Sequence, residues 1–238
     1  MHQFEIRRLV PLELFGFDVS FTNSSLWMVI AVAVVAGFLI LSMRGRSLVP
    51  TRLQSTAEVM YEFMAKTLRE VCGPEGMKYF PFIFTLFMFI LACNMLGLIP
   101  GSFTVTSHII VNVALALTVF LMVTAIGFIK NGPGFLRMFV PSGVPMFLLP
   151  LIVVIEVISY FMRPVSLSVR LFANMLAGHI LLKVFAGFVL GLGLAGGIAP
   201  LVFMIGFTGF ELMVAVLQAF IFALLSCIYL NDALHTHH

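Results

Sequence analysis

The sequence predicts an all-α, polytopic membrane protein, and three features of the chain indicate this class. Sixty-one per cent of its 238 residues are hydrophobic and only 10% are charged, against about 25% charged residues in a typical soluble domain. The apolar residues gather in runs of about 20, the length that a helix needs to cross a bilayer. Most lysines and arginines fall in two connecting loops. We expect the whole chain, 1–238, to form a single membrane domain.

The first third of the chain predicts one span and one surface helix. Residues 1–23 mix polar and apolar side chains and are expected to lie at the membrane surface. Residues 25–43 are almost entirely apolar and are followed at once by Arg44, which is typical of a transmembrane helix and its charged end. Residues 53–72 repeat apolar side chains every three or four positions. They predict an amphipathic helix that either lies on the membrane or packs against a partner.

The rest of the chain predicts a transmembrane hairpin and two long antiparallel helices. The apolar runs 80–99 and 105–129 are separated by a Pro-Gly dipeptide, which marks a turn. Residues 145–190 are apolar on both sides of Pro164. A proline can kink a transmembrane helix without ending it, so this stretch is either one bent helix or two. After a glycine-rich turn, residues 201–230 form the final helix.

The positions of the basic residues predict the orientation in the membrane. Residues 44–78 contain six lysines and arginines, and residues 130–137 contain two. Two predicted spans separate these loops, so both lie on the same side. Because basic loops stay in the cytoplasm, the N-terminus is expected outside.

Only five formally charged side chains interrupt the apolar stretch from residue 144 to residue 230: Glu156, Arg163, Arg170, Lys183 and Glu211. A charge at the bilayer centre costs at least about 2.5–3.5 kcal/mol. Arg170 is the extreme case, because a guanidinium cannot lose its proton to escape that cost. Ionisable residues at membrane depth mark functional sites. We therefore interpret Arg170 as the fixed charge of a proton path.

The residue numbers predict which positions of the two long helices face each other. The turn between them is centred near residue 194, and in an antiparallel pair the numbers of facing residues have a constant sum. Arg170 with Gln218 gives 388, and His179 with Glu211 gives 390, both close to twice the turn centre. The sequence thus predicts a cation opposite an amide and an imidazole opposite a carboxylate.

Helical periodicity adds a second relation among the polar residues. Glu156, Arg163 and Arg170 recur every seven residues and so share one face of a helix. Asn174 follows one turn beyond, whereas His179 lies on a face turned away from Arg170. A histidine and a carboxylate at membrane depth can both exchange protons near working pH. Chains of such groups carry protons into a bilayer, and a fixed arginine can block a leak between two half-paths.

Several of these positions also have a purely structural interpretation. The His179–Glu211 pair can join two helices, and Asn174 and Gln218 can be interhelical hydrogen-bonding residues. The asparagines of the hairpin, Asn94 and Asn112, are expected to be packing or hydrogen-bonding residues. The remaining cations, Arg163 and Lys183, can extend toward the membrane surface. Arg163 can instead pair with Glu156.

Three sequence segments resemble subunit a of the F-type ATP synthases. They are RPVSLSVRLFANMLAGH (163–179), LQAFIFALLSCIYL (217–230) and NMLGLIP (94–100). The resemblance covers nearly the whole chain. It implies a stator in the membrane sector that lies against a rotating ring of c subunits and has two aqueous half-channels. The two long helices are strongly tilted in this family. That agrees with a final helix of about 30 residues and about 45 Å, longer than a hydrocarbon core of about 30 Å.

By this resemblance, each polar position takes a role. Arg170 is similar to the family's essential arginine, and Asn174 and Gln218 to its polar companions. The half-channel positions are Glu156, His179 and Glu211, with Arg163 and Lys183 as supporting residues. Many bacterial members exchange the order of the histidine and the carboxylate, so which partner carries the proton stays open. Gly97 stands where some bacterial members have an acidic residue, and that route is expected to be absent.

The resemblance also implies partners and a location. The partners are the c-subunit ring, the peripheral-stalk b subunits, the rest of the ATP synthase, the lipid bilayer and protons, and no nucleic acid. The expected location is the bacterial inner membrane, with the mitochondrial inner membrane as the second choice. We expect no catalysis by the chain alone and no cofactor or metal, and the three scattered cysteines lack the spacing of a zinc site. An autonomous transporter would show internal repeats and an intramembrane enzyme a nucleophile–base or metal motif, and neither pattern is found.

Overall fold

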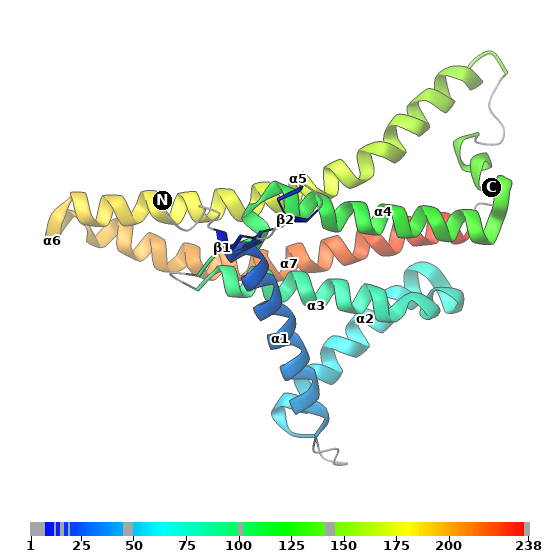
Figure 1. The fold of residues 1–238 in the computed structure, drawn as a ribbon. Helices are drawn as coiled ribbons and strands as arrows, with labels where there is room; N and C mark the ends of the chain where they lie inside the picture. The colour runs from blue at the N-terminus through cyan, green and yellow to red at the C-terminus, as the bar shows by residue number, and fades with distance from the viewer. Residues whose placement is uncertain are drawn as a thin grey trace.

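The computed structural model describes residues 8–11, 13–14, 17–18, 20–44, 50–99, 102–140 and 146–235, and most of them are helical (Figure 1). The helices are α1 (Asn23–Met43), α2 (Arg52–Gly76), α3 (Phe80–Gly97), α4 (Ile109–Asn131), α5 (Leu149–Gly191), α6 (Gly193–Gly196) and α7 (Ile198–Leu234), with the 3-10 segments η2 (Met77–Tyr79), η3 (Val105–Ser107) and η4 (Gly132–Phe139) between them. This architecture confirms the all-α prediction.

Five helical segments in the described ranges are long and apolar enough to cross a membrane. They are Asn23–Met43, Arg52–Gly97, Ile109–Phe139, Leu149–Gly191 and Ile198–Leu234. Before the first of them, four short strands form two antiparallel ribbons. These are β1 (Arg8–Val10) with β4 (Phe21–Thr22), and β2 (Glu13–Leu14) with β3 (Phe17–Asp18).

The long helices α5 and α7 form the axis of the molecule. They run antiparallel and are joined at one end by α6, and α3 and α4 pack along them (Figure 1). The main core lies between these four helices and α2, and its fully buried side chains include Leu167, Leu171, Met175 and Phe222. At the turn, Gly193 has a φ of 67°, a left-handed conformation that glycine adopts without steric cost.

The structure resolves the question at Pro164 in favour of one helix. α5 is continuous over 43 residues with Pro164 inside it, and its ribbon changes direction between the yellow-green and the yellow part in Figure 1. Because a proline removes one backbone donor and clashes with the preceding turn, it bends a helix that tertiary contacts keep intact. At 1.5 Å per residue the helix is about 65 Å long, roughly twice the thickness of a hydrocarbon core. Such a helix must be strongly inclined.

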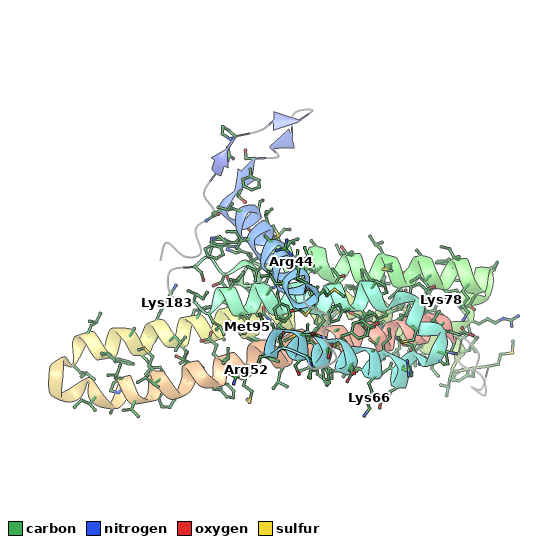
Figure 2. The ribbon with its side chains drawn as sticks, turned by 90° about the horizontal axis from the view of Figure 1, so that it is seen from below. Arg44, Arg52, Lys66, Lys78, Met95 and Lys183 are labelled. Carbon is green, nitrogen blue, oxygen red and sulfur yellow. The ribbon has the colours of Figure 1, made fainter. Side chains whose placement is uncertain are left out.

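The amphipathic helix packs within the chain rather than standing alone. The apolar face of α2 lies against α7, where Met64, Leu68 and Cys72 are buried. The Cys72 thiol donates a hydrogen bond of 3.1 Å to the Cys227 carbonyl. On the opposite face, Lys66 points away from the other helices (Figure 2). Near its end α2 turns at Gly73, whose φ of 68° interrupts the helical conformation.

The second helix of the hairpin begins later than predicted. The apolar run from residue 105 suggests a span at once, but 105–107 form the 3-10 turn η3, and α4 starts at Ile109. The physical reason is the polar sequence of this connection. Thr104, Thr106 and Ser107 are buried, and the hydroxyl of Ser107 donates to the Thr104 carbonyl at 2.7 Å, which favours a turn over a continued helix.

Candidate functional site

A buried imidazole–carboxylate pair lies between the two long helices. His179 on α5 and Glu211 on α7 approach each other with 4.0 Å between Nδ1 and Oε1. Their exposed fractions are 9% and 4%. The antiparallel arrangement around α6 brings the two residues to the same depth, as the arithmetic of their residue numbers predicts.

The Glu211 carboxylate fits against α5 because residue 178 is glycine. A Cβ added at Gly178 would lie 2.5 Å from Glu211 Oε1, closer than any real side chain allows. Neither carboxylate oxygen has a hydrogen-bond partner among the described residues. A buried carboxylate without donors is costly in its ionised form. The geometry therefore suits a group that binds and releases a proton.

The other edge of the imidazole contacts the connection between α3 and α4. Thr104 Oγ1 lies 3.1 Å from His179 Nε2 and also donates to the Gly97 carbonyl at 3.3 Å. Sequence reasoning missed Thr104 as a partner of the pair. The sequence feature that could have indicated this contact is the group of hydroxyl residues between two apolar runs. In a short connection, hydroxyl groups can hydrogen-bond to the backbone of the same segment, so the connection can be buried.

Two asparagines support the same region by hydrogen bonds to the backbone. Asn94 on α3 donates to the Ala215 carbonyl at 3.1 Å, and Asn112 on α4 donates to the Thr106 carbonyl at 2.7 Å. Both side chains are fully buried. They hold α7 and the η3 segment in place around the pair, which is the hydrogen-bonding role expected of them.

Gln218 faces Asn174 in the structure. The side chain of Gln218 is 3% exposed, and its Oε1 lies 3.5 Å from Asn174 Nδ2. Arg170, which the sequence places opposite Gln218 at the same depth, is not its hydrogen-bond partner among the described residues. The pairing is one helical turn further along α5 than the arithmetic predicts.

Arg170 lies on the open face of α5. Its side chain is exposed, as is that of Glu156 two heptads earlier. Val165 and Val169 on the same stretch are exposed too. Within the described ranges, no acidic side chain pairs with Arg170. This face therefore presents a permanent cation in apolar surroundings.

Arg163, in contrast, is half-buried and has partners within the chain. Its Nη1 donates to Asp232 Oδ2 at 2.8 Å, and its guanidinium lies 5.4 Å from the ring centroid of Tyr160 and 4.8 Å from that of Tyr229. Both distances fall within the range of cation–π attraction. The suggested pairing of Arg163 with Glu156 was wrong, because the end of α7 supplies a closer carboxylate from 69 residues away.

The sequence also singled out Lys183 and the three cysteines. Lys183 is half-buried on α5, one turn beyond His179 (Figure 2). The three cysteines are buried free thiols. In the part of the chain that the structure describes, no group of three or more His, Cys, Asp or Glu side chains could hold a metal ion.

Comparison with known proteins places the chain next to one kind of membrane protein. Residues 25–231 match the family model described as ATP synthase A chain. ATP synthase subunit a of Chelativorans sp. (strain BNC1) is 59% identical over 244 residues, covering 100% of this chain and 98% of that protein. ATP synthase subunit a of Rhizobium meliloti (strain 1021) is 58% identical over 240 residues, with 98% and 96% covered. The subunit of Parvibaculum lavamentivorans is 56% identical over 244 residues, with 100% and 94% covered.

Proposed function

Because this chain belongs to the ATP synthase A chain family, we propose that it is the stator that carries protons past a rotating ring of c subunits. In this role it provides two aqueous half-channels and couples proton flow to rotation and to ATP synthesis. It performs no catalysis by itself. The whole chain acts as one membrane domain.

The observation that carries this proposal is the exposed Arg170 on the open face of α5, which pairs with no acidic side chain among the described residues. An arginine side chain in contact with lipid would cost at least about 2.5–3.5 kcal/mol, and the guanidinium cannot lose its proton to avoid that cost. A partner that presents carboxylates to this face removes that cost. The c ring is such a partner, because each of its subunits carries an ionisable carboxyl group at membrane depth by the family resemblance.

The proton path follows the depth of the polar residues. A proton enters from the outside through Glu211 and His179, with Asn174 and Gln218 beside the route, and passes to a ring carboxylate. After nearly a full turn of the ring it leaves on the cytoplasmic side near Glu156. Each elementary charge gains about 2.3 kcal/mol per 100 mV of membrane potential.

Arg170 has two tasks in this scheme. Its charge favours the ionised form of the ring carboxylate that arrives opposite it, so the proton is released to the exit half-channel. The same charge repels a proton that would cross directly from one half-channel to the other. Arg163 and Lys183 support the path without taking part in it. Arg163 is neutralised by Asp232.

The proposed location is the inner membrane of a bacterium, with the N-terminus outside. The relatives named above come from bacteria. Lys130 at the end of α4 forms an ion pair with Glu75 at the end of α2. This contact supports placing both basic loops on one side, which the positive-inside rule assigns to the cytoplasm. The peripheral-stalk b subunits complete the set of proposed partners.

The proposal is tested with Arg170→Ala in the assembled ATP synthase, reconstituted in liposomes. We expect ATP synthesis to be lost while assembly, checked by subunit composition, is normal. We also expect a passive proton leak, measured with a pH-sensitive dye under an imposed potential. Arg69→Ala, which removes an exposed arginine of α2, is the matched control and should behave as the wild type. Normal synthesis in the Arg170→Ala complex would contradict the proposal.

A further inference from the structure

We propose that Thr104 is a positioning residue that fixes the tautomer of the neutral His179 ring, so that the imidazole presents a lone pair to Glu211. This inference rests on the proposed function, because it assigns a role within the entry half-channel. Its physical basis is the hydrogen-bond inventory of three groups that meet in one buried place: the Gly97 carbonyl, the Thr104 hydroxyl and the His179 Nε2 atom.

The first step concerns the single hydrogen of the Thr104 hydroxyl. The last carbonyls of a helix lack an intrahelical partner, and Gly97 is the final residue of α3. Thr104 Oγ1 donates to the Gly97 carbonyl at 3.3 Å. A hydroxyl has one hydrogen to donate and can then only accept. Toward His179, 3.1 Å away, Thr104 is therefore the acceptor.

The second step follows for the imidazole ring. If Thr104 accepts, His179 Nε2 must carry a hydrogen, and a neutral imidazole has only one N–H. The other nitrogen, Nδ1, then carries a lone pair. Nδ1 is the atom that faces Glu211, at 4.0 Å from Oε1. The basic nitrogen of the ring is thus directed at the carboxyl group.

The third step explains why this arrangement is rigid. A Cβ added at Gly97 would lie 2.8 Å from Thr104 Cγ2, so only glycine at the end of α3 lets Thr104 pack this closely. Thr104 itself is 2% exposed. Its carbonyl accepts the Ser107 hydroxyl at 2.7 Å, which fixes the backbone on the other side of the residue.

The arrangement supports a balanced proton transfer. Protonated Glu211 gives its proton to Nδ1: the O–H bond breaks, an N–H bond forms, and a carboxylate and an imidazolium result. The reverse step restores the neutral pair. At 4.0 Å the transfer needs a small approach of the two side chains or one bridging water. With the opposite ring tautomer, Nδ1 would already carry a hydrogen and could not accept.

The test compares Thr104→Val and Thr104→Ser in the assembled ATP synthase in liposomes. Valine has nearly the shape of threonine without the hydroxyl, and serine keeps the hydroxyl. We expect Thr104→Val to lower the rate of proton-driven ATP synthesis about 2- to 10-fold, the effect of losing one hydrogen bond. We expect Thr104→Ser to keep the wild-type rate. Thr118→Val, on the exposed side of α4, is the matched control.

A spectroscopic measurement separates positioning from packing. The complex is labelled with ¹⁵N-histidine, and the His179 signals are identified by their loss in His179→Gln. We expect the wild type to show protonated Nε2 and unprotonated Nδ1, the Thr104→Val complex a mixture of tautomers, and Thr104→Ser the wild-type pattern. A wild-type ring protonated at Nδ1, or a Thr104→Val ring with an unchanged tautomer and rate, would overturn the inference.

The same variants distinguish this inference from the proposed function. If His179→Gln retains normal synthesis, the proposed entry path is wrong whatever Thr104 does. If His179→Gln loses synthesis while Thr104→Val has the wild-type rate and tautomer, the path stands and only the role of Thr104 falls. Should Thr104→Val fail to assemble, the wild-type tautomer and the Thr104→Ser complex still decide.

Discussion

Arg163 and Arg170 are seven residues apart on α5, and they lie in opposite surroundings. Arg163 has a carboxylate at 2.8 Å and two aromatic rings within 6 Å. Arg170 is exposed and pairs with no acidic group of the described chain. The two side chains carry the same charge, so the difference in their pairing comes from their neighbours: α7 provides a carboxylate near Arg163, and the open face of α5 provides none near Arg170 among the described residues. A half-buried, neutralised arginine stabilises a fold, whereas an exposed one at membrane depth needs a partner from outside.

The largest effect, and the largest difference between the two arginines, should appear when each is changed to lysine in turn. Lysine keeps a charge but loses the planar fork, and it can lose its proton when desolvated. For Arg170→Lys we expect ATP synthesis to fall more than about tenfold, equivalent to ~1.4 kcal/mol on the barrier. For Arg163→Lys we expect a rate within about twofold of the wild type, because a lysine there can still pair with Asp232. Equal losses at both positions would remove the distinction.

The next effect concerns the stability that the Arg163–Asp232 pair adds. The two side chains are 23% and 35% exposed, so the pair is partly shielded from water. We expect Arg163→Gln and Asp232→Asn each to lower the free energy of unfolding by about 1–2 kcal/mol. The double variant should lose less than the sum of the two. Denaturant unfolding of the purified subunit in detergent measures this, and strict additivity would show that the pair contributes nothing.

A smaller effect is expected one turn from Arg170. Asn174→Ala removes the donor to Gln218, and interhelical hydrogen bonds in membranes contribute about 0.6 kcal/mol on average. We therefore expect a modest loss of stability, about a third to a half of the loss at Arg163, in the same unfolding assay. A loss as large as that of Asp232→Asn would show that the Asn174–Gln218 contact stabilises the two helices as much as the Arg163 pair does.

The smallest effect should come from His108, which lies in the connection before α4 and is distant in sequence from both arginines. Burial lowers the pKa of His108 below its ordinary value of 6.5, and its ring stacks on Phe103 at 4.9 Å. Below pH 6.5 the unfolded chain therefore binds more protons than the folded one, and stability falls as the pH falls.

In His108→Phe, which keeps the stacking, this part of the acid sensitivity should disappear. The measurement is the melting temperature of the detergent-solubilised subunit at pH 7.5 and 5.5. His235→Phe, at the exposed end of α7, is the control. If His108→Phe and the wild type lose the same stability on acidification, the buried environment of His108 does not contribute to the pH dependence.

The helices and the imidazole–carboxylate pair could be predicted because they depend on local patterns. Apolar runs locate α1, α3 and α7, and a glycine-rich turn near residue 194 places His179 opposite Glu211. The same arithmetic was less accurate further from the turn. Contacting residues have numbers that add to 390 at the pair, 392 for Asn174 with Gln218 and 395 for Arg163 with Asp232. A constant sum holds only for parallel axes and short side chains.

The contacts that sequence reasoning missed all join residues far apart in the chain. Asp232 follows the last apolar run and looks like part of a polar tail, yet it neutralises Arg163. Thr104 belongs to a connection that hydrophobicity alone assigns to the surface or to the next span, yet it contacts His179. No periodicity encodes such pairings, because they depend on where the elements meet after packing.

The residue type that position 178 can accept depends on the residue at position 211. A Cβ at position 178 would lie 2.5 Å from Glu211 Oε1, so a larger residue there requires the Glu211 carboxylate to move or residue 211 to be shorter. Among homologous chains, the two positions should therefore vary together rather than independently. A chain that carries alanine or serine at 178 is expected to place its carboxyl group elsewhere.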